Sequence, residues 1–571
     1  MPIFFNGRLI TTPTVASRVD DSAMFNANPA VGNVLTILGR ADAGEPKKAL
    51  RFGSASEAAA VLRGGELLDA VSRAFGGMTE TPGPSEIIAV RVQPATGSTL
   101  ALKDSGDATV INLASSVYGT LANRLQIAIA AATTRGKKIT TKLDSETYEA
   151  DNVGRQVANI RYSGNAASAT VTINSTTLTL SAPTGTTVAT LDLATFATVA
   201  DLVDRISLVS GWTASVADGS GEHPTAGALD FLTGVDAKTA DLPLYADLQA
   251  VVDWINGTAE PLMTATKVAG AGNVPTNITS SFLAGGSNGN TQVSDWAEAL
   301  TMLQSEDTQW VVPVSGDAAV HALVAAHVKF MSDVMAKERR AIVGTALSTT
   351  DAAAIAAAKA INSDRVGLVH LGVYDYNTAG KLTLFSPYIA AAILGGGFAG
   401  VNPGTALTNK ALSVRGLERK LRNPTDTDVL LRGGVIPLED RPTGYFVVQS
   451  ISTWLTNTNY NRRELSTGAA LDYAARALRE AMQPIIGKNG NAARLAEAKA
   501  RATTVLNELA RAEPQGLGVL AGDADNPAWK GLKISISGDV LRLEVQASPV
   551  IPINYIPIVI FAQPYSGSVA A

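Results

Sequence analysis

The residues Gln309-Trp310-Val311-Val312-Pro313-Val314 form a short apolar run that predicts a buried strand. Ser315-Gly316-Asp317 follows at once and predicts the start of a helix. The next apolar side chains recur three or four residues apart, so they share one helix face. They are Val320, Leu323, Val324, His327, Val328, Met331 and Met335. A strand that leads directly into an amphipathic helix is typical of a parallel α/β unit.

The same pattern continues on both sides of this stretch. A strand at 342–344, an Ala-rich helix at 351–361 and a strand at 365–371 follow it. Near the start of the chain, a strand at 33–39 precedes a helix that begins at Ser54, with Glu57 at the capping-box spacing. A strand at 86–92 completes that unit. We therefore predict one α/β domain formed by residues 31–118 and 283–400.

Residues 119–282 differ in composition from the segments that flank them. Between 161 and 200 there are fifteen Ser or Thr residues and two charged residues, with apolar residues at alternating positions. This alternation, punctuated by Gly and Pro, predicts β-strands with one solvated face. We interpret 119–282 as a β-rich insertion that faces outward.

A third unit of α+β type is predicted over residues 401–545. It contains two expected helices, at 464–483 and 492–511, and an expected hairpin over 533–545 that turns at Gly538-Asp539.

The two ends of the chain are apolar and lack a helical period. After Glu544 there are 27 residues without Asp, Glu, Lys or Arg, and the strand-like part of this segment contains Pro552 and Pro557. Proline marks an edge strand or an extended arm, because it cannot donate to a ladder. Two interpretations remain open: a last strand of the chain's own domain, or a strand added to the sheet of another subunit. The expected inter-subunit residues are Ile3, Phe4, Phe5 and Leu9 in an N-terminal arm (1–30) and Ile551, Ile553, Tyr555, Ile558 and Ile560 in a C-terminal arm (546–571).

Composition excludes several classes of function. The net charge of −5 disfavours a dedicated nucleic-acid binder, and the absence of cysteine excludes disulfides and thiol nucleophiles. The most apolar run, 550–561, is too short for a membrane span and contains two prolines. The first residues do not read as a secretory signal, so synthesis in the cytoplasm is expected.

Motifs for catalysis or cofactor binding are weak. His321 and His327 are six residues apart on one predicted helix and cannot share a metal as an i, i+4 pair can; His223 and His370 lie elsewhere. Residues 395–400 fit the dinucleotide-binding pattern G-x-G-x-x-G formally, but they follow a helix-like segment, so we predict a flexible turn between domains. We expect no enzyme activity, cofactor or metal.

Basic side chains at 415–422 form either a solvated face or an electrostatic contact with an acidic partner. The candidates are Arg415, Arg419, Lys420 and Arg422, with Arg476 and Arg479 on the predicted helix at 464–483.

An ordered series of segments resembles the tail sheath proteins of contractile-tailed bacteriophages. The series includes Phe-Leu-Ala-Gly-Gly-Ser-Asn-Gly at 282–289, Asp-Trp-Ala-Glu-Ala-Leu at 295–300, the strand at 310–313, the helix at 320–328 and Glu-Arg-Arg-Ala-Ile-Val-Gly at 338–344. Segments at 33–39, 52–54, 88–92, 119–125 and 460–463 extend the likeness over most of the chain outside about 130–280.

The resemblance implies a structural subunit that forms a helical homo-oligomer of stacked hexameric rings around a tail tube protein. It implies partner contacts with baseplate and tail terminator proteins, a place in the virion tail after assembly in the host cytoplasm, and no membrane insertion. It further implies that both arms add strands to neighbouring subunits and that contraction drives the tube through the target envelope without nucleotide. The tube-facing candidates are the six basic residues named above.

Three other interpretations remain open. The chain could form the sheath of a bacterial contractile injection particle. The Ser/Thr-rich block suggests a non-contractile surface-layer or adhesion protein, against which the α/β pattern after residue 283 argues. An α/β enzyme is the third alternative.

Overall fold

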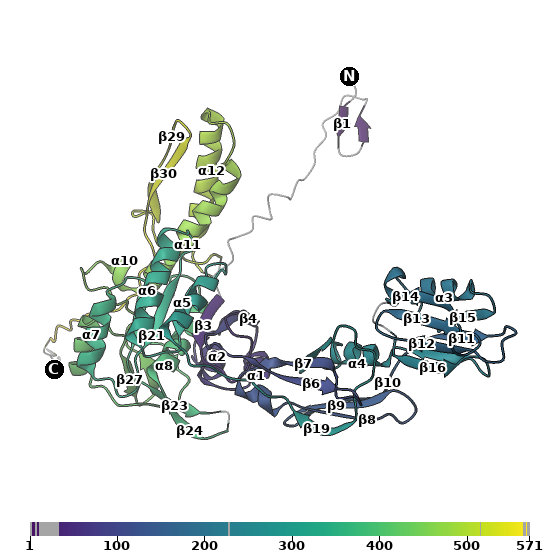
Figure 1. The fold of residues 1–571 in the computed structure, drawn as a ribbon. Helices are drawn as coiled ribbons and strands as arrows, with labels where there is room; N and C mark the ends of the chain where they lie inside the picture. The colour runs from purple at the N-terminus through teal and green to yellow at the C-terminus, as the bar shows by residue number, and fades with distance from the viewer. Residues whose placement is uncertain are drawn as a thin grey trace.

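The computed structural model describes residues 3–5, 8–10, 34–225, 229–377, 379–513, 515–563 and 567 (Figure 1). Strand β1 (Ile3–Phe5) pairs antiparallel with β2 (Arg8–Ile10). The side chains of Ile3, Phe4, Phe5 and Leu9, and the remainder of the predicted N-terminal arm, lie outside the described part of the chain.

A six-stranded sheet forms the centre of the subunit. Its strands lie in the order β22 (Val366–Val369), β21 (Arg340–Gly344), β20 (Trp310–Pro313), β3 (Val34–Gly39), β5 (Glu86–Arg91) and β4 (Ala49–Phe52). All neighbours are parallel except β4, which runs antiparallel to β5. Because β20 pairs with β3, one sheet contains strands from both sides of the β-rich block. The predicted mixed α/β multidomain class is confirmed.

Helices cover both faces of this sheet. α5 (Val293–Met302), α6 (Ala318–Asp333) and α7 (Asp351–Ile361) pack together on one face, and α2 (Glu66–Gly76) and α8 (Pro387–Gly400) pack on the other, with α1 (Ala55–Leu62) beside α2. The caps follow the sequence pattern: Ser54 accepts a hydrogen bond from the backbone of Glu57, and Asp317 accepts one from Ala319.

The prediction of a flexible turn at residues 395–400 is wrong, because these residues form the last part of α8, which is buried among the helices and strands of the α/β domain. A Cβ atom on Gly396 would overlap the backbone carbonyl of Ala74 in α2, and one on Gly400 would overlap the carbonyl of Pro82. A Cβ atom on Gly395 would lie 2.7 Å from Val312 in β20. The glycines therefore allow the backbone of α8 to approach the neighbouring α2 and β20 closely.

The β-rich block forms two bodies that extend away from the α/β domain (Figure 1). The nearer body contains the sheets β18-β7-β6 and β10-β9-β8-β19 together with α4 (Asp247–Ile255). The farther body contains the sheets β15-β11-β17 and β14-β13-β12-β16 together with α3 (Val199–Ser207). In the nearer body the strands are β6 (Gly97–Lys103), β7 (Thr109–Tyr118), β8 (Gln126–Ala131), β9 (Lys137–Leu143), β10 (Glu146–Val153), β18 (Met263–Lys267) and β19 (Ile278–Phe282). In the farther body they are β11 (Gln156–Tyr162), β12 (Thr170–Ile173), β13 (Thr177–Ser181), β14 (Thr187–Asp192), β15 (Trp212–Val216), β16 (Leu232–Asp236) and β17 (Leu242–Tyr245).

Two domain boundaries lie at other positions in the structure than the sequence predicted. Strands β6 and β7 were predicted within the α/β domain, but β7 pairs with β18 of the insertion and β6 pairs with β7. Ile111 and Leu113 of β7 pack in the same core as Leu125 and Ile127. The insertion therefore begins near residue 97 rather than at 119.

Residues 401–465, predicted as part of the third unit, contribute instead to the α/β core, for example through Leu407, Leu430 and Leu465. Their elements are β25 (Ala411–Leu412), β26 (Gly416–Leu417), α9 (Thr425–Arg432), β27 (Leu438–Arg441), β28 (Gly444–Val447) and α10 (Tyr460–Arg463). Strand β26 pairs with β23 (Val373–Tyr376), which also pairs with β24 (Leu382–Phe385).

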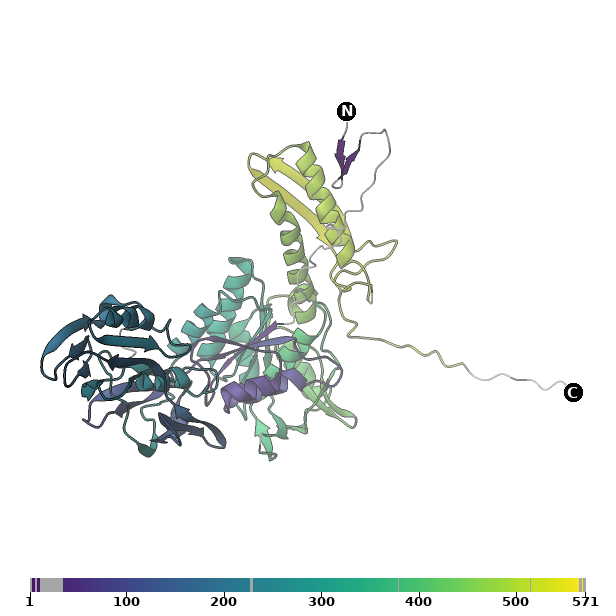
Figure 2. The same cartoon turned by 90° about the vertical axis from the view of Figure 1, so that its right-hand side faces the viewer.

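The C-terminal unit stands clear of the α/β domain (Figure 2). It consists of α11 (Leu465–Met482), α12 (Ala492–Leu509) and the hairpin of β29 (Trp529–Ser537) and β30 (Val540–Ala547). Both predicted helices and the predicted hairpin are confirmed. Among the described residues, no helix is long and apolar enough to span a membrane.

The close approach of α8 can be tested with Gly396→Ala. The added methyl group meets the backbone of α2, which cannot rotate away, so we expect a loss of about 1–3 kcal/mol in the free energy of unfolding. Chemical denaturation measures this loss. Gly76→Ala is the matched control, because a Cβ atom there has no neighbour within 4 Å and should change stability by less than about 1 kcal/mol. Equal stability of the two variants would contradict the close-packing account.

Candidate assembly surfaces

The C-terminal unit has a small core of its own. Ala470, Tyr473 and Ala474 of α11 pack with Leu506 and Leu509 of α12. The inner face of the β29–β30 hairpin packs on the same core, through Trp529, Leu532 and Val545. This unit is thus a helical hairpin covered by a two-stranded sheet.

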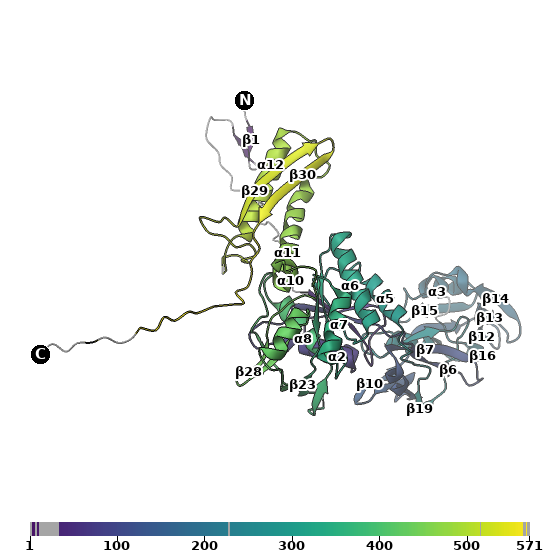
Figure 3. The same ribbon diagram turned by 90° about the vertical axis from the view of Figure 1, so that its left-hand side faces the viewer.

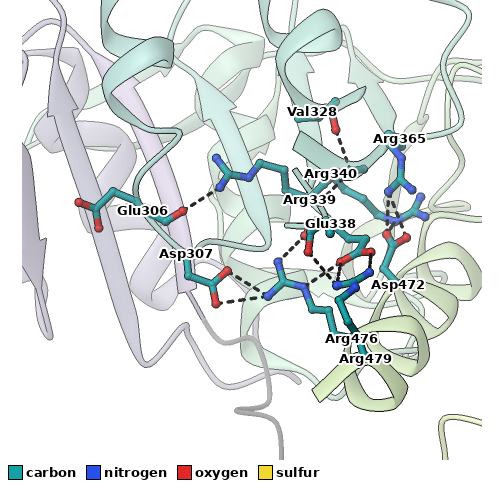
Figure 4. A network of polar contacts seen from close by, with 12 residues as sticks. Glu306, Asp307, Val328, Glu338, Arg339, Arg340, Arg365, Asp472, Arg476 and Arg479 are labelled. Atoms are coloured by element: carbon teal, nitrogen blue, oxygen red, sulfur yellow. Dashed lines mark hydrogen bonds and ion pairs between the residues drawn. The ribbon is translucent and has the colours of Figure 1, made fainter. Parts of the chain in front are cut away.

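A network of arginines and carboxylates joins α11 to the α/β domain (Figure 4). The carboxylate of Asp472 accepts from Arg340 Nε at 2.8 Å and from Arg365 Nη1 at 2.9 Å. Arg340 stands at the start of β21 and Arg365 just before β22, so Asp472 connects α11 to two neighbouring strands. Burial lowers the pKa of Arg340, and removal of its carboxylate partner would leave a buried charge uncompensated.

Arg476 and Arg479 belong to the same network. Arg476 Nη1 donates to Asp307 at 3.0 Å, and its Nη2 donates to the backbone carbonyl of Glu338 at 2.8 Å. Arg479 forms an ion pair with Glu338 and donates to the carbonyl of Ala336 at 2.7 Å. Both residues were predicted to face a tube; the structure places their charged groups in contacts within the subunit. These contacts could not be predicted from the sequence, because the acidic partners of both arginines are more than a hundred positions away.

The basic run at 415–422 does not form one helix face, because part of it is strand β26. Arg419 pairs with Asp351, Arg422 pairs with Asp426 at 2.7 Å, and Lys420 lies 3.7 Å from Asp440. The side-chain hydrogen bond from Arg422 lowers the pKa of Asp426 to about 2. The guanidinium of Arg415 lies 5.8 Å from the ring centroid of Tyr376. These residues lie in one region of the α/β domain, and their role toward a tube stays a prediction.

The C-terminal arm leaves the subunit after Val550 (Figures 2 and 3). Val550 N donates to Val519 O at 3.1 Å, and Ala521 N donates to Ser548 O at 2.9 Å, so residues 548–550 belong to the C-terminal unit. Beyond Val550 the chain is extended and has no strand partner among the described residues. Seven large apolar side chains from 553 onward are at least 73% exposed: Ile553, Tyr555, Ile556, Ile558, Val559, Ile560 and Phe561.

The predicted residues of the C-terminal arm are therefore exposed within the single subunit. Four of them, Ile553, Tyr555, Ile558 and Ile560, are among these seven, and Ile551 is partly exposed. Sequence reasoning omitted Ile556, Val559 and Phe561, which the same uncharged run could have indicated. The alternative of a last strand in the chain's own domain disagrees with the described residues 548–563 and 567, in which no strand follows β30.

The β29–β30 sheet has an unpaired backbone edge on each side. It contains two strands, and the part of the chain that the structure describes provides no third. An exposed sheet edge is a template for a strand from another chain. The subunit thus presents both an unpaired strand-like arm and two unpaired edges.

Three of the four histidines make side-chain contacts inside the α/β domain. His327 lies at 3.0 Å from Arg339, and burial together with that charge lowers the pKa of His327 to about 3. His321 contacts the carbonyl of Ser315, and His370 contacts Asp351. Within the described ranges, no group of three or more His, Asp or Glu residues is placed to hold a metal ion.

Fold and surfaces together define a multidomain α/β subunit built for assembly. Curated relatives agree with this class: the chain is 25% identical to the tail sheath protein of Bacillus phage SP01 over 97% of this chain and 95% of that protein. It is 29% identical to a putative tail sheath protein of Enterococcus phage phiEF24C over 83% of this chain and 85% of that protein. No protein-family profile matches the chain.

Solved structures share the fold. The sheath tail protein of Desulfitobacterium hafniense matches with a TM-score of 0.56 at 14% identity, over 94% of this chain and 97% of that one. The sheath tail protein of Listeria innocua matches with a TM-score of 0.55 at 12% identity, over 91% and 93% of the two chains. The predicted resemblance to phage tail sheath proteins is confirmed.

The joint at Asp472 can be tested with Asp472→Asn. The substitution keeps the shape of the side chain but leaves Arg340 and Arg365 without their shared carboxylate. We expect a loss of about 3–5 kcal/mol in the free energy of unfolding, measured by denaturant titration. Asp307→Asn, in an exposed ion pair with Arg476, is the control and should cost at most about 1 kcal/mol. Similar small losses in both variants would contradict a structural role for the joint.

Proposed function

We propose that the subunit polymerises around an inner tube through its C-terminal arm and the β29–β30 edges, and that the polymer contracts while these links stay intact. The observation that carries the proposal is the exposure of Ile553, Ile558, Ile560 and Phe561 on an arm with no partner strand. Burial of each such side chain is worth about 1.5–3 kcal/mol. An arm of this kind is stabilised when a neighbouring subunit covers it.

The prolines limit which part of the arm forms the added strand. Pro552 and Pro557 are five residues apart, so in an extended chain their missing N–H groups interrupt opposite edges. Residues 558–563 follow the second proline and contain no other, which gives six consecutive backbone donors. Six residues is a usual strand length. We therefore assign the strand that joins a neighbouring sheet to 558–563.

The rigid parts of the subunit have complementary roles in this proposal. The α/β domain and the C-terminal unit, joined at Asp472, move as one piece, and the arm beyond Val550 acts as the link. The insertion extends away from the α/β domain (Figure 1), and in the proposed sheath it faces outward. The N-terminal arm forms a second link, and the basic residues at 415–422 are the remaining candidates for a tube contact.

Partners and location follow from the sheath assignment. The proposal includes a tube protein, baseplate and terminator contacts, assembly in the host cytoplasm, and no enzymatic step. The named relatives are phage proteins, which favours a phage tail over a bacterial injection particle. A non-contractile surface-layer protein is disfavoured by the same relatives.

A deletion of residues 555–571 tests the role of the arm. Because Ser548 and Val550 keep their hydrogen bonds and Asn554 keeps its contact with the buried Glu464, we expect the truncated subunit to keep its free energy of unfolding. Electron microscopy should show hollow helical tubes or rings for the full chain and discrete monomers for the deletion. Tubes of normal length from the truncated chain would contradict the proposed link.

A point variant distinguishes an effect of the arm's apolar side chains from an effect of the arm's length. Ile558→Asp in the full-length chain places a charge in the proposed added strand and should also prevent tube formation, whereas Gln563→Asp at the end of that strand should have a smaller effect.

A further inference from the structure

The first residues of the C-terminal arm, 551–554, lie against the subunit in an alternating pattern, and we call them the strap. Ile551 and Ile553 are 47% and 83% exposed, whereas Pro552 and Asn554 are half-buried. Alternate side chains of an extended chain point to opposite sides, so Pro552 and Asn554 face the subunit. The strap is therefore the part of the arm that still touches its own subunit.

The strap ends on a buried carboxylate at the start of α11. Glu464 is 2% exposed and accepts hydrogen bonds from Ser450 Oγ at 2.9 Å and from Gln449 Nε2 at 3.3 Å. The side chain of Asn554 contacts the same carboxylate, and burial raises the pKa of Glu464. A carboxylate only accepts hydrogen bonds, so the amide nitrogen of Asn554 is the end that faces it.

Few contacts hold the strap in place. Thr467 Oγ1 donates to the carbonyl of Val550 at 3.2 Å, directly before the strap, and Asn554 contacts Glu464 at its end. No backbone hydrogen bond joins residues 551–563 to the other described residues. The oxygen Oδ1 of Asn554 is buried and has no hydrogen-bond partner among the described residues. Release of the strap would expose this oxygen to water, so the seated state is only weakly favoured.

The strand that the arm adds to a neighbour would be held more firmly than the strap. Residues 558–563 offer a ladder of backbone hydrogen bonds to the neighbouring sheet. Four large apolar side chains, from Ile558 to Phe561, become buried at the same time. The strap, in contrast, has one side-chain contact at each end. A pull between the two subunits therefore frees the strap before it detaches the strand.

We propose that residues 551–554 form a releasable strap, seated beside Glu464 in the resting subunit and pulled free when the neighbour that holds 558–563 moves away. The free link to that strand then starts at Val550 instead of Asn554, so its extended length doubles from about 13 Å to about 26 Å. This role of the strap rests on the proposed function as a polymerising sheath. It adds a reserve of length to the link, so that both ends stay attached while the subunits change their relative positions.

The absence of native cysteine allows two spin labels to be placed in one subunit. Val429→Cys on α9 and Ile553→Cys in the strap are at positions 54% and 83% exposed, so the labels should not disturb packing. Double electron–electron resonance then measures the distance between the two labels in the isolated subunit and in tubes diluted with unlabelled chain. We expect a narrow distance distribution in the subunit and in extended tubes. In contracted tubes the distribution should be broad and displaced by up to about 13 Å.

Asn554→Ala in the labelled chain tests the contact with Glu464. Loss of a contact with a carboxylate should raise the fraction of subunits with a released strap about tenfold or more, so the isolated subunit should already show the broad distribution. Tyr555→Ala is the matched control, because Tyr555 follows the strap and is 75% exposed, and it should keep the narrow distribution. Thermal unfolding checks that both variants are folded. The same distribution in the two variants would overturn the proposal.

The labelled tubes also separate failure of the strap from failure of the sheath function. An unchanged narrow distribution after contraction would show that the strap stays seated, and would refute its release while leaving the proposed sheath function intact. A broad distribution in the isolated subunit that retains Asn554 would show that the strap is not held, with the same consequence. Absence of tubes from the unmodified chain would instead refute the sheath function, and the role of the strap with it.

Discussion

The carboxylate of Asp472 sets the position of the C-terminal unit relative to the rest of the subunit. It binds Arg340 and Arg365 at the amino ends of two adjacent parallel strands, where both arginines are largely removed from water. Charges in such a site are stable only when they are paired, so the three side chains hold one another in a fixed geometry. Arg476 and Arg479 extend the network to Asp307 and Glu338. A subunit with this joint transmits force between its domains instead of bending there.

The chain contains both closely packed parts and an exposed part that lacks packing partners. The glycines of α8 allow backbone-to-backbone packing at the centre of the α/β domain, where a larger residue would separate the layers. The arm beyond Val550 has the opposite character, because its described large apolar side chains from Ile553 onward are at least 73% exposed in the single subunit. A polymer that changes shape while its subunits stay connected needs rigid subunits and flexible links between them. The packed α/β core and the exposed arm meet these two needs.

Local signals in the sequence predicted much of the fold. The strand at 310–313, the helix that begins after Asp317 and the capping residue Ser54 follow from short-range patterns, and the structure confirms them. The uncharged, proline-containing C-terminal run left open either a last strand of the chain's own domain or an arm for another subunit, and the exposure of Ile553 and Ile558 agrees with the arm.

Long-range pairing could not be predicted in this way. Residues 395–400 look like a turn because glycine disfavours helices, and the close neighbour at Ala74 that requires glycine is more than three hundred positions away. The acidic partners of Arg476 and Arg479 are 169 and 141 positions away, so two internal ion pairs looked like a contact surface. The place of β6 and β7 in the insertion could not be predicted for the same reason, because β7 pairs with β18, which lies about 150 residues further on, and β6 pairs with β7.

Hydrogen exchange at the arm tests the central claim most directly. The backbone amides of 558–563 can be followed by mass spectrometry in the isolated subunit and in the assembled tube. Our account predicts fast exchange in the subunit and strong protection in the tube, because the arm acquires a strand partner only from a neighbour. Equally fast exchange in both states would contradict the account.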